Sequence, residues 1–524
     1  MATRPDGRWE DARVGTRVAV AASSELATAA GVRLGESGGN AVDAALAAVL
    51  VAMVCEPGVC APAGGLFVTV APADGSPPVT VDGYVEMPGR GLPAERFGRS
   101  VHEVSTGYGG GLTTNVGHGS VATPGAFAGL DLANRNYGRA PWPEVVAPAA
   151  EAARVGFPLG SAAAYYLDFC REGVFDWHPD GRAVLRHPDG RLLEQGDIVH
   201  IPHLADSLDL LAAEGAAAFY TGDLARLVAA DMAEHEGLLT AADLAAYRPI
   251  VRPALALRAS DWRLATNPPP AIGGVAFAAM LALLGDRPRG DWTDDDVRHL
   301  VAVQDAVLRH RLDHLDVAPD RVAAAARLLD VALVGDLTKI GTAASTVHVS
   351  VVDEEGTACA ITSSAGYGSG VMTPGTGIWL NNSLGEQELN RTGVHSLPPG
   401  ERLASNMAPT VGRRDDGAAI AIGSPGADRI TTALLQVLAG YVNGGLPLPA
   451  SIERPRLHVR HTPDGSVIDH EEDLPLPALD LPTRALHPNA MYFGGVGAAL
   501  READGTLLAA GDPRRAAAVA VTPE

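Results

Sequence analysis

A hydroxyl side chain in an unusual position is the first candidate for chemistry in this sequence. Residues 343–356 read AASTVHVSVVDEEG, and Thr346 stands at the first position of a predicted strand. Valines at 347, 349 and 351 alternate with other residues, which is typical of a strand with one well-buried side. If the chain is cut before it, Thr346 offers a hydroxyl nucleophile and an α-amine whose unperturbed pKa, about 7.7–8, suits a general base. Without such a cut, it is an ordinary β-forming threonine.

Three further patterns suggest chemistry, and each has a simpler interpretation. The glycine-rich segment TGYGGGLTTNVGHG (106–119) lacks the spacing of a phosphate-binding loop, so it predicts tight turns. Gly117 to Ala122 approaches a serine nucleophile elbow, but alanine stands at its fifth position and no strand clearly precedes it. His310 and His314 have metal-like spacing without a Glu-x-x-His pattern, which favours a solvated helix face. We expect no metal ion and no cofactor.

Composition and charge restrict the classes of partner. The chain has 524 residues, 47% of them hydrophobic, and a formal net charge of -22 with a pI near 5.1. This acidic balance repels phosphate backbones and anionic membrane surfaces, so neither nucleic acid nor a membrane is an expected partner. The most apolar helical stretch, 41–55, is too short to span a bilayer. The charged N-terminus has no secretory pattern, so we expect a cytoplasmic protein whose four cysteines are reduced core residues: Cys55, Cys60, Cys170 and Cys359.

The elements that must position Thr346 follow from periodicity and turn residues. Asn40 is a suitable N-cap for the second of two early helices, and Asp43 favours the positive end of that helix. Helices predominate before residue 346 and strands after it, with a turn at 353–356 between two strands. This mixture predicts stacked layers in the order α, β, β, α. The expected helices are 23–34, 41–55, 125–137, further segments to about 247, 274–284 and 293–338, and the expected strands include 66–70, 79–82, 347–352 and 358–362.

Nine segments, in order along the chain, resemble the γ-glutamyltranspeptidase family. They are GGNAVDAA (38–45), CEP (55–57), GSVATPGAFAGL (119–130), AFYTGDLA (218–225), GLLTAADLAAY (237–247), NPPPAIGG (267–274), TVHVSVVDEEG (346–356), GTGIWLNNSL (375–384) and GSPGADRI (423–430). Each segment alone is a weak signal. Nine collinear segments, between about residues 17 and 460, make chance similarity untenable.

The resemblance implies the α/β N-terminal nucleophile hydrolase fold, a four-layer αββα sandwich, and a precursor that cuts itself. The cut would fall after Ser345, so that a large fragment, 1–345, and a small fragment, 346–524, form one intertwined domain. Thr346 would be the nucleophile, its freed amine the base, and Ser364 the hydroxyl that orients this amine. The backbone N–H groups of Gly426 and Ala427 would form the oxyanion hole, where the family usually has two glycines.

The residues that the resemblance assigns to the substrate pocket depart from the family pattern. Valine at Val85, before Glu86, occupies the place of the arginine that binds the α-carboxylate of a glutamyl group, and valine supplies no charged hydrogen bond. Arg90 is a candidate replacement. Glu386 stands for the aspartate that pairs with the α-amino group. The other departures are Ser383 where glutamine is common, Asn406 after Ser405 in place of a second serine, a shorter loop after Ser364, and Thr346-Val347 in place of a threonine doublet.

These departures concern recognition and leave the nucleophile in place. The resemblance therefore implies an autoprocessed amide or acyl hydrolase or transferase that acts on a small molecule other than a standard γ-glutamyl compound. One alternative is a carbon–carbon bond hydrolase of a biosynthetic pathway, as some relatives are. An alternative of another class is an inactive relative that serves as a binding protein. The two fragments would be each other's partners, and an oligomer of such heterodimers remains open.

Overall fold

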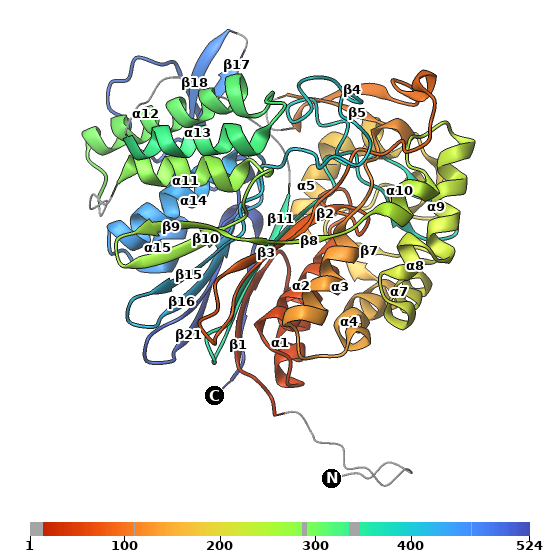
Figure 1. Cartoon of the computed structure of the whole chain (residues 1–524), viewed down its shortest axis with the longest axis horizontal. Coiled ribbons are helices and arrows are strands. Elements are labelled where there is room, and N and C mark those ends of the chain that lie inside the picture. The colour runs from red at the N-terminus through yellow and green to blue at the C-terminus, as the bar shows by residue number, and fades with distance from the viewer. Residues whose placement is uncertain (1–13, 109–110, 286–290, 335–345, 463, 524) are drawn as a thin grey trace.

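Two antiparallel sheets lie face to face between layers of helices (Figure 1). The computed structural model describes residues 14–108, 111–285, 291–334, 346–462 and 464–523. The first sheet has the strand order β22 (Ala518–Val521), β1 (Val18–Ala22), β11 (Val347–Asp353), β12 (Ala358–Ser364), β2 (Gly65–Ala71), β3 (Val79–Gly83), β8 (Ile250–Pro253). The second has the order β21 (Leu507–Gly511), β20 (Gly497–Arg501), β16 (Ala419–Gly423), β15 (Thr410–Arg414), β10 (Trp262–Thr266), β9 (Leu255–Ala259).

Short side chains fill the layer between the two sheets. Most of its residues are alanines, because the strands that face each other carry small residues at alternate positions. Three of its members precede residue 346, in β1, β2 and β10, and eight follow it, in β11, β12, β15, β16, β20 and β21, so the layer joins distant parts of the chain. The buried residues of this cluster are Ala19, Ala71, Ala265, Val352, Ala358, Ala360, Val411, Ala419, Ala421, Ala499 and Leu507.

Helices cover the outer face of each sheet, which confirms the predicted αββα order. On the first sheet lie α1 (Glu25–Glu36), α2 (Ala41–Cys55) and α3 (Ala126–Tyr137), and on the second lie α11 (Gly273–Leu284), α14 (Arg429–Leu438) and α15 (Leu448–Glu453). Every residue of α2 is buried, because this helix packs between β11 and the helices α1 and α4 (Trp142–Val155). As predicted, Asn40 caps α2, and Asp43 completes a capping box with it.

The predicted division into helices first and strands later is too simple. Both sheets combine strands from before and after residue 346, and α14 and α15 follow the strands β15 and β16. The expected helix 293–338 is α12 (Asp294–His310), a π-helical turn (Arg311–Leu315) and α13 (Arg321–Val334), with 335–338 outside the described residues. The prediction that β11 has one buried side is wrong, since all seven of its residues are buried between α2 and the second sheet.

The remaining elements form the periphery of the sandwich. All four cysteines are buried and unpaired, as expected for reduced core residues. Within the described ranges, no helix has the length and apolarity needed to cross a membrane. The peripheral elements are β4 (His102–Thr106), β5 (Leu112–Val116), α5 (Ser161–Cys170), α6 (Pro179–Val184), α7 (Leu204–Glu214), α8 (Ala217–Tyr220), α9 (Asp223–Glu234), α10 (Ala241–Ala246), and the strands β17 (Leu457–Thr462), β18 (Gly465–Glu471) and β19 (Thr483–Leu486).

Candidate active site

Thr346 and Ser364 occupy opposite positions at one end of the β11–β12 pair. Val347 pairs with Ser363 in this antiparallel ladder, so the next pair in register is Thr346 with Ser364. Opposite residues of an antiparallel pair carry their side chains on the same face, with Cβ atoms about 4.5–5.5 Å apart. Both residues are buried, and the Ser364 hydroxyl accepts a hydrogen bond of 3.0 Å from the N–H of Gly366. The ladder therefore brings together the two hydroxyls that the sequence pointed to.

His348 lies on the same face of β11 as Thr346 but does not serve it as a base. Its Nδ1 is 2.8 Å from the Thr362 hydroxyl and its Nε2 is 2.7 Å from the Ser350 hydroxyl. Burial lowers the pKa of His348 to about 3, so the ring is neutral at physiological pH. With both nitrogens engaged, this histidine is a structural residue between the sheets, and a proton acceptor for Thr346 has to come from elsewhere.

Two consecutive backbone N–H groups follow β16 in a strained conformation. Gly426 has φ 120° and Ala427 has φ 70°, so an alanine occupies the left-handed region that normally costs a residue with a Cβ about 1–2 kcal/mol. Among the described residues, neither N–H has a hydrogen-bond acceptor. Pro425, the residue before them, lines the same cavity as Thr346. The strain therefore maintains two unused donors beside the predicted nucleophile, the arrangement that an oxyanion hole requires.

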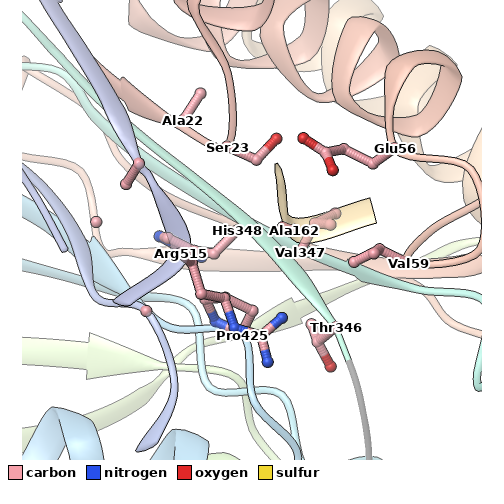
Figure 2. A pocket seen from close by; sticks show the side chains of 13 residues that line it. Ala22, Ser23, Glu56, Val59, Ala162, Thr346, Val347, His348, Pro425 and Arg515 are labelled. Atoms are coloured by element: carbon pink, nitrogen blue, oxygen red, sulfur yellow. The ribbon is translucent and has the colours of Figure 1, made fainter. Parts of the chain in front are cut away.

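A cavity of about 30 Å³ lies beside Thr346 and has a carboxyl group in its wall (Figure 2). Figure 2 shows Glu56 and Ser23 facing each other on one side of this cavity, with Arg515 and Thr346 on the other. Burial raises the pKa of Glu56 to about 8, and the Ser23 hydroxyl and the Arg515 charge only partly offset this effect. Glu56 is thus a protonated acid at neutral pH. The sequence contained this residue only as part of the CEP segment, and no local pattern indicated its burial beside the nucleophile.

We expect Glu56 to make the protein less stable as the pH rises. Because its folded-state pKa lies above the unfolded value near 4.5, its contribution is fully present below that value and is lost as the pH rises toward 8. The loss is on the order of 3–5 kcal/mol for a shift of this size. Glu56→Gln should remove this part of the pH dependence and be more stable than the wild type at pH 8. Denaturant unfolding at pH 5 and pH 8 measures the difference.

The same substitution at the exposed Glu25 provides the control for this experiment. Glu25→Gln should follow the wild-type pH dependence of the free energy of unfolding. If Glu56→Gln and Glu25→Gln give the same pH dependence, Glu56 is ionised in the folded protein and the inferred protonation state is wrong.

The Val85 position is apolar in the structure as well as in the sequence. Val85 is fully buried in a cluster with Phe67, Met87 and Leu384. It also lies directly beside the nucleophile strands, since a Cβ on Gly65, the partner of Ser364 in the β2–β12 ladder, would be 2.9 Å from the Val85 nitrogen. At Val85, the wall of the predicted pocket therefore carries no positive charge.

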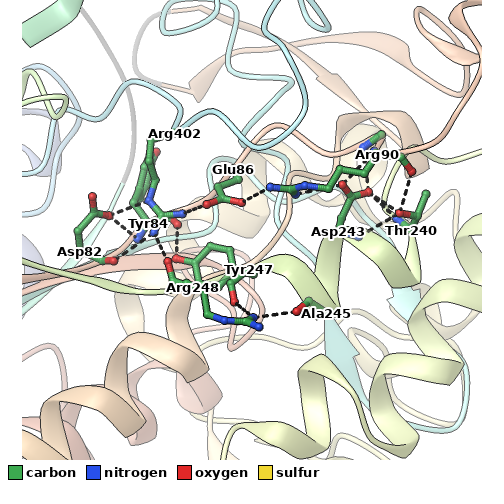
Figure 3. Close-up of polar contacts among 11 residues, drawn as sticks. Asp82, Tyr84, Glu86, Arg90, Thr240, Asp243, Ala245, Tyr247, Arg248 and Arg402 are labelled. Carbon is green, nitrogen blue, oxygen red and sulfur yellow. Dashed lines mark hydrogen bonds and ion pairs between the residues drawn. The ribbon is translucent and has the colours of Figure 1, made fainter.

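Two arginines near this wall are already engaged by carboxylates (Figure 3). Arg402 contacts Glu86 and lies 3.2 Å from Asp82, and its guanidinium stacks on the ring of Tyr247. Arg90 lies 3.3 Å from Glu86 and 3.3 Å from Asp243. Both oxygens of Glu86 thus bind arginine, and Arg90 is held away from the role of the missing family arginine.

The other predicted pocket residues gather around Tyr84. The Tyr84 hydroxyl lies against the side chains of Ser383 and Ser405, and the charge of Glu386 is close enough to raise the pKa of Tyr84 beyond the effect of burial. Burial, and then the neighbouring Glu388, raise the pKa of Glu386 well above its usual range. Asn406 is buried, and its backbone packs against Gly273 at the start of α11. Tyr84 was not among the predicted site residues, although it precedes Val85.

A glycine turn places Glu386 near Ser364, the residue opposite Thr346 in the β11–β12 register. Gly366, whose N–H donates to Ser364, has φ 64°, and a Cβ on it would lie 3.2 Å from a carboxylate oxygen of Glu386. Neither oxygen of Glu386 has a hydrogen-bond partner among the described residues. A buried carboxyl group without partners is available to a ligand that enters beside Ser364.

Comparison with known proteins places this geometry in one family. The sequence profile described as Gamma-glutamyltranspeptidase matches residues 27–522. The Acylase ACY 1 proenzyme of Pseudomonas sp. (strain V22) is 31% identical over 523 residues, which cover 95% of this chain and 92% of that protein. The Glutathione hydrolase proenzyme of Escherichia coli (strain K12) is 29% identical over 481 residues, or 85% and 81% of the two chains.

Solved structures agree on the fold. The crystal structure of cephalosporin acylase from Bacillus halodurans superposes with a TM-score of 0.78 at 23% identity, covering 99% of this chain and 98% of that one. The profile match spans nearly all of the chain, and the relatives are enzymes made as precursors. The chain therefore belongs to the gamma-glutamyltranspeptidase family of autoprocessed N-terminal nucleophile hydrolases and transferases.

Proposed function

We propose that this protein is an acylase whose N-terminal Thr346 attacks an amide substrate. The acyl group of this substrate lacks the α-carboxylate that a γ-glutamyl group carries. The observation that carries the proposal is the apolar wall predicted at Val85, where the neighbouring Arg90 and Arg402 are already paired with carboxylates. Burying an unpaired carboxylate against this wall is strongly unfavourable. The similarity to the Acylase ACY 1 proenzyme of Pseudomonas sp. (strain V22) supports an acylase activity.

The proposed reaction begins with a cut before Thr346 that frees its α-amine. Ser345, on the other side of this bond, lies outside the described residues. The amine accepts the proton of the Thr346 hydroxyl, whose oxygen attacks the substrate carbonyl, while Ser364 holds the amine in place. The N–H groups of Gly426 and Ala427 stabilise the negative oxygen that forms. The amine product leaves with a proton, and water or another amine then releases the acyl group from its ester with Thr346.

In this proposal, Glu386 selects substrates whose acyl chain carries an amino group. Its carboxyl group is buried without a hydrogen-bond partner among the described residues and lies beside the turn that contacts Ser364. A substrate ammonium group would supply the missing donors and would lower the pKa of Glu386 from its raised value by providing a positive charge. An acyl chain with an amino group and no α-carboxylate fits both Glu386 and Val85.

Four p-nitroanilides that differ only in the acyl group test this specificity. They are the γ-glutamyl, 4-aminobutyryl, glutaryl and butyryl compounds, which carry both polar groups, the amine alone, the carboxylate alone, or neither. We expect kcat/KM to be highest for the 4-aminobutyryl compound and at least about tenfold lower for the γ-glutamyl compound, since a poorly matched buried charge costs more than 1.4 kcal/mol. Release of p-nitroaniline at 25 °C measures each rate.

Each ranking has a definite meaning for the proposal. If the γ-glutamyl compound is the best of the four, the wall at Val85 does not exclude the carboxylate and the proposed substrate class is wrong. If the butyryl and 4-aminobutyryl compounds react equally, Glu386 does not bind the amine. If none reacts and electrophoresis under denaturing conditions shows an uncut chain, the protein is a binding relative without catalysis.

A further inference from the structure

The structure brings three metal-binding side chains together at a distance from Thr346. His118 lies in the short helical turn His118–Ser120, Asp231 lies in α9, and His235 directly follows α9. One ligand atom from each lies within 4.8 Å of the others. The Nε2 atom of His118 is 3.6 Å from one oxygen of Asp231, and Nδ1 of His235 is 3.2 Å from the other oxygen. Nδ1 of His235 also donates a hydrogen bond of 3.0 Å to the carbonyl oxygen of Asp231, which leaves Nε2 as the nitrogen of His235 that can bind a metal ion. The imidazole rings of His118 and His235 stack with their centroids 4.3 Å apart.

The buried polar atoms of this cluster lack partners. Asp231 is 6% exposed and His118 is 5% exposed. Among the described residues, neither oxygen of Asp231 nor Nε2 of His118 makes a hydrogen bond that satisfies normal geometry. A buried carboxylate without hydrogen-bond partners costs stability unless a cation or a donor meets it. These orphaned atoms point to a ligand that bridges the three side chains.

We propose that His118, Asp231 and His235 bind one Zn²⁺ ion. Two imidazole nitrogens and one carboxylate oxygen are a ligand set that zinc accepts, with water in the fourth position. The ligand atoms have only to close from within 4.8 Å to the shorter separations of a coordination sphere. His235 is exposed, so an ion reaches the cluster from solvent through this side chain. A ligand set of this kind holds the metal only when the histidines are neutral, so affinity falls in acid.

The ion would hold two segments of the large fragment together next to the predicted substrate pocket. The segment that follows His118 contacts the opposite fragment, since the carbonyl of Ser120 accepts a hydrogen bond from the Leu384 N–H. The N–H of Ala122 donates to the side chain of Asn381, two residues before Ser383. Zinc would join this segment to α9 and thereby stabilise the backbone on which the pocket loop rests. The site is structural and does not depend on the acylase proposal.

Zinc titration of the full chain tests the site without an activity measurement. The chain is treated with a chelator, passed over a desalting column and titrated with ZnSO₄, and bound zinc is measured by elemental analysis. We expect one ion per chain and a higher melting temperature in its presence, since a ligand that binds only the folded state stabilises it. Replacing zinc by Co²⁺ should produce visible absorption bands from nitrogen and oxygen coordination.

His235→Asn is the principal variant because the exposed side chain tolerates substitution. It should bind zinc at least about 100-fold more weakly, beyond the range seen when only an outer partner of a ligand is lost. His314→Asn is the matched control, since His314 is also an exposed histidine one turn from another ring, that of His310. This control should bind zinc as the wild type does.

The outcomes separate the proposal from its alternatives. Asp231→Asn should also abolish zinc binding and the Co²⁺ bands, and circular dichroism confirms that each variant is folded. The inference is overturned if the wild type retains no zinc, if His235→Asn binds it as tightly as the wild type, or if His314→Asn loses it.

Discussion

Thr346→Ala is expected to leave the protein as one uncut polypeptide of 524 residues without acylase activity. Self-cleavage and catalysis both require the Thr346 oxygen as nucleophile, and alanine has none. His348, the histidine on the same strand, is neutral with both nitrogens engaged and cannot activate a different nucleophile there. The rate should fall by about 10⁶-fold, the scale seen when a hydrolase loses its nucleophile.

Denaturing electrophoresis and mass spectrometry measure this result directly. The wild type should separate into fragments 1–345 and 346–524, with a free threonine amine at the start of the smaller fragment. Thr346→Ser is the matched control because it retains a hydroxyl at the same position, and it should still cut itself. Substrate turnover by an intact wild-type chain, or retained turnover in Thr346→Ala, would contradict the mechanism.

Gly426→Ala is expected to lower kcat by about 10²–10³-fold, the effect of losing one oxyanion donor. Gly426 has φ 120°, and a Cβ built on it would lie 2.7 Å from the Cα of Gly494, so the backbone has to move. Because this backbone carries the N–H groups of Gly426 and Ala427, the movement misplaces both donors. Steady-state kinetics with the preferred p-nitroanilide should show the loss in kcat rather than in KM.

The neighbouring substitution Ala427→Gly is the control for this prediction. Ala427 has φ 70°, so glycine relieves backbone strain while it retains the N–H donor. The variant should keep kcat within a few-fold of the wild type and gain about 0.5–1 kcal/mol in free energy of unfolding, since relief of strain exceeds the added freedom of the unfolded chain. Equal loss of kcat in Gly426→Ala and Ala427→Gly would exclude the proposed oxyanion hole.

Local signals in the sequence were sufficient for the elements around the nucleophile. The helix at 41–55 begins and ends where the apolar run, Asn40 and Pro57 indicated. The strand after Thr346 and its returning partner were predicted from alternation and the turn between them. Hydrogen bonds within helices and hairpins join residues that are close in the chain, so their patterns can be read from short windows.

The family resemblance assigned roles to residues that no periodic pattern in the sequence connects. It assigned Ser364 to orient the Thr346 amine, and the β11–β12 register puts the two residues opposite each other. It also identified Val85 as the position that lacks a charge, and the structure places Val85 in an apolar cluster. The sequence predicted one well-buried side of β11, whereas both sides are buried, because alternation of polar and apolar residues cannot distinguish solvent from a second sheet that supplies hydrogen-bond partners.

The sequence by itself determined the local structure, and it predicted Thr346 as the nucleophile and the missing positive charge at Val85. Only the tertiary structure decided that Glu56 lies beside Thr346, that Arg90 binds Glu86 and Asp243, and that His118 meets Asp231 and His235. The reason is physical. Contacts between residues that are distant in the chain depend on how sheets and helices pack after long loops close. The surroundings of each side chain in the packed protein then set its protonation and metal affinity, and no short segment of sequence contains this information.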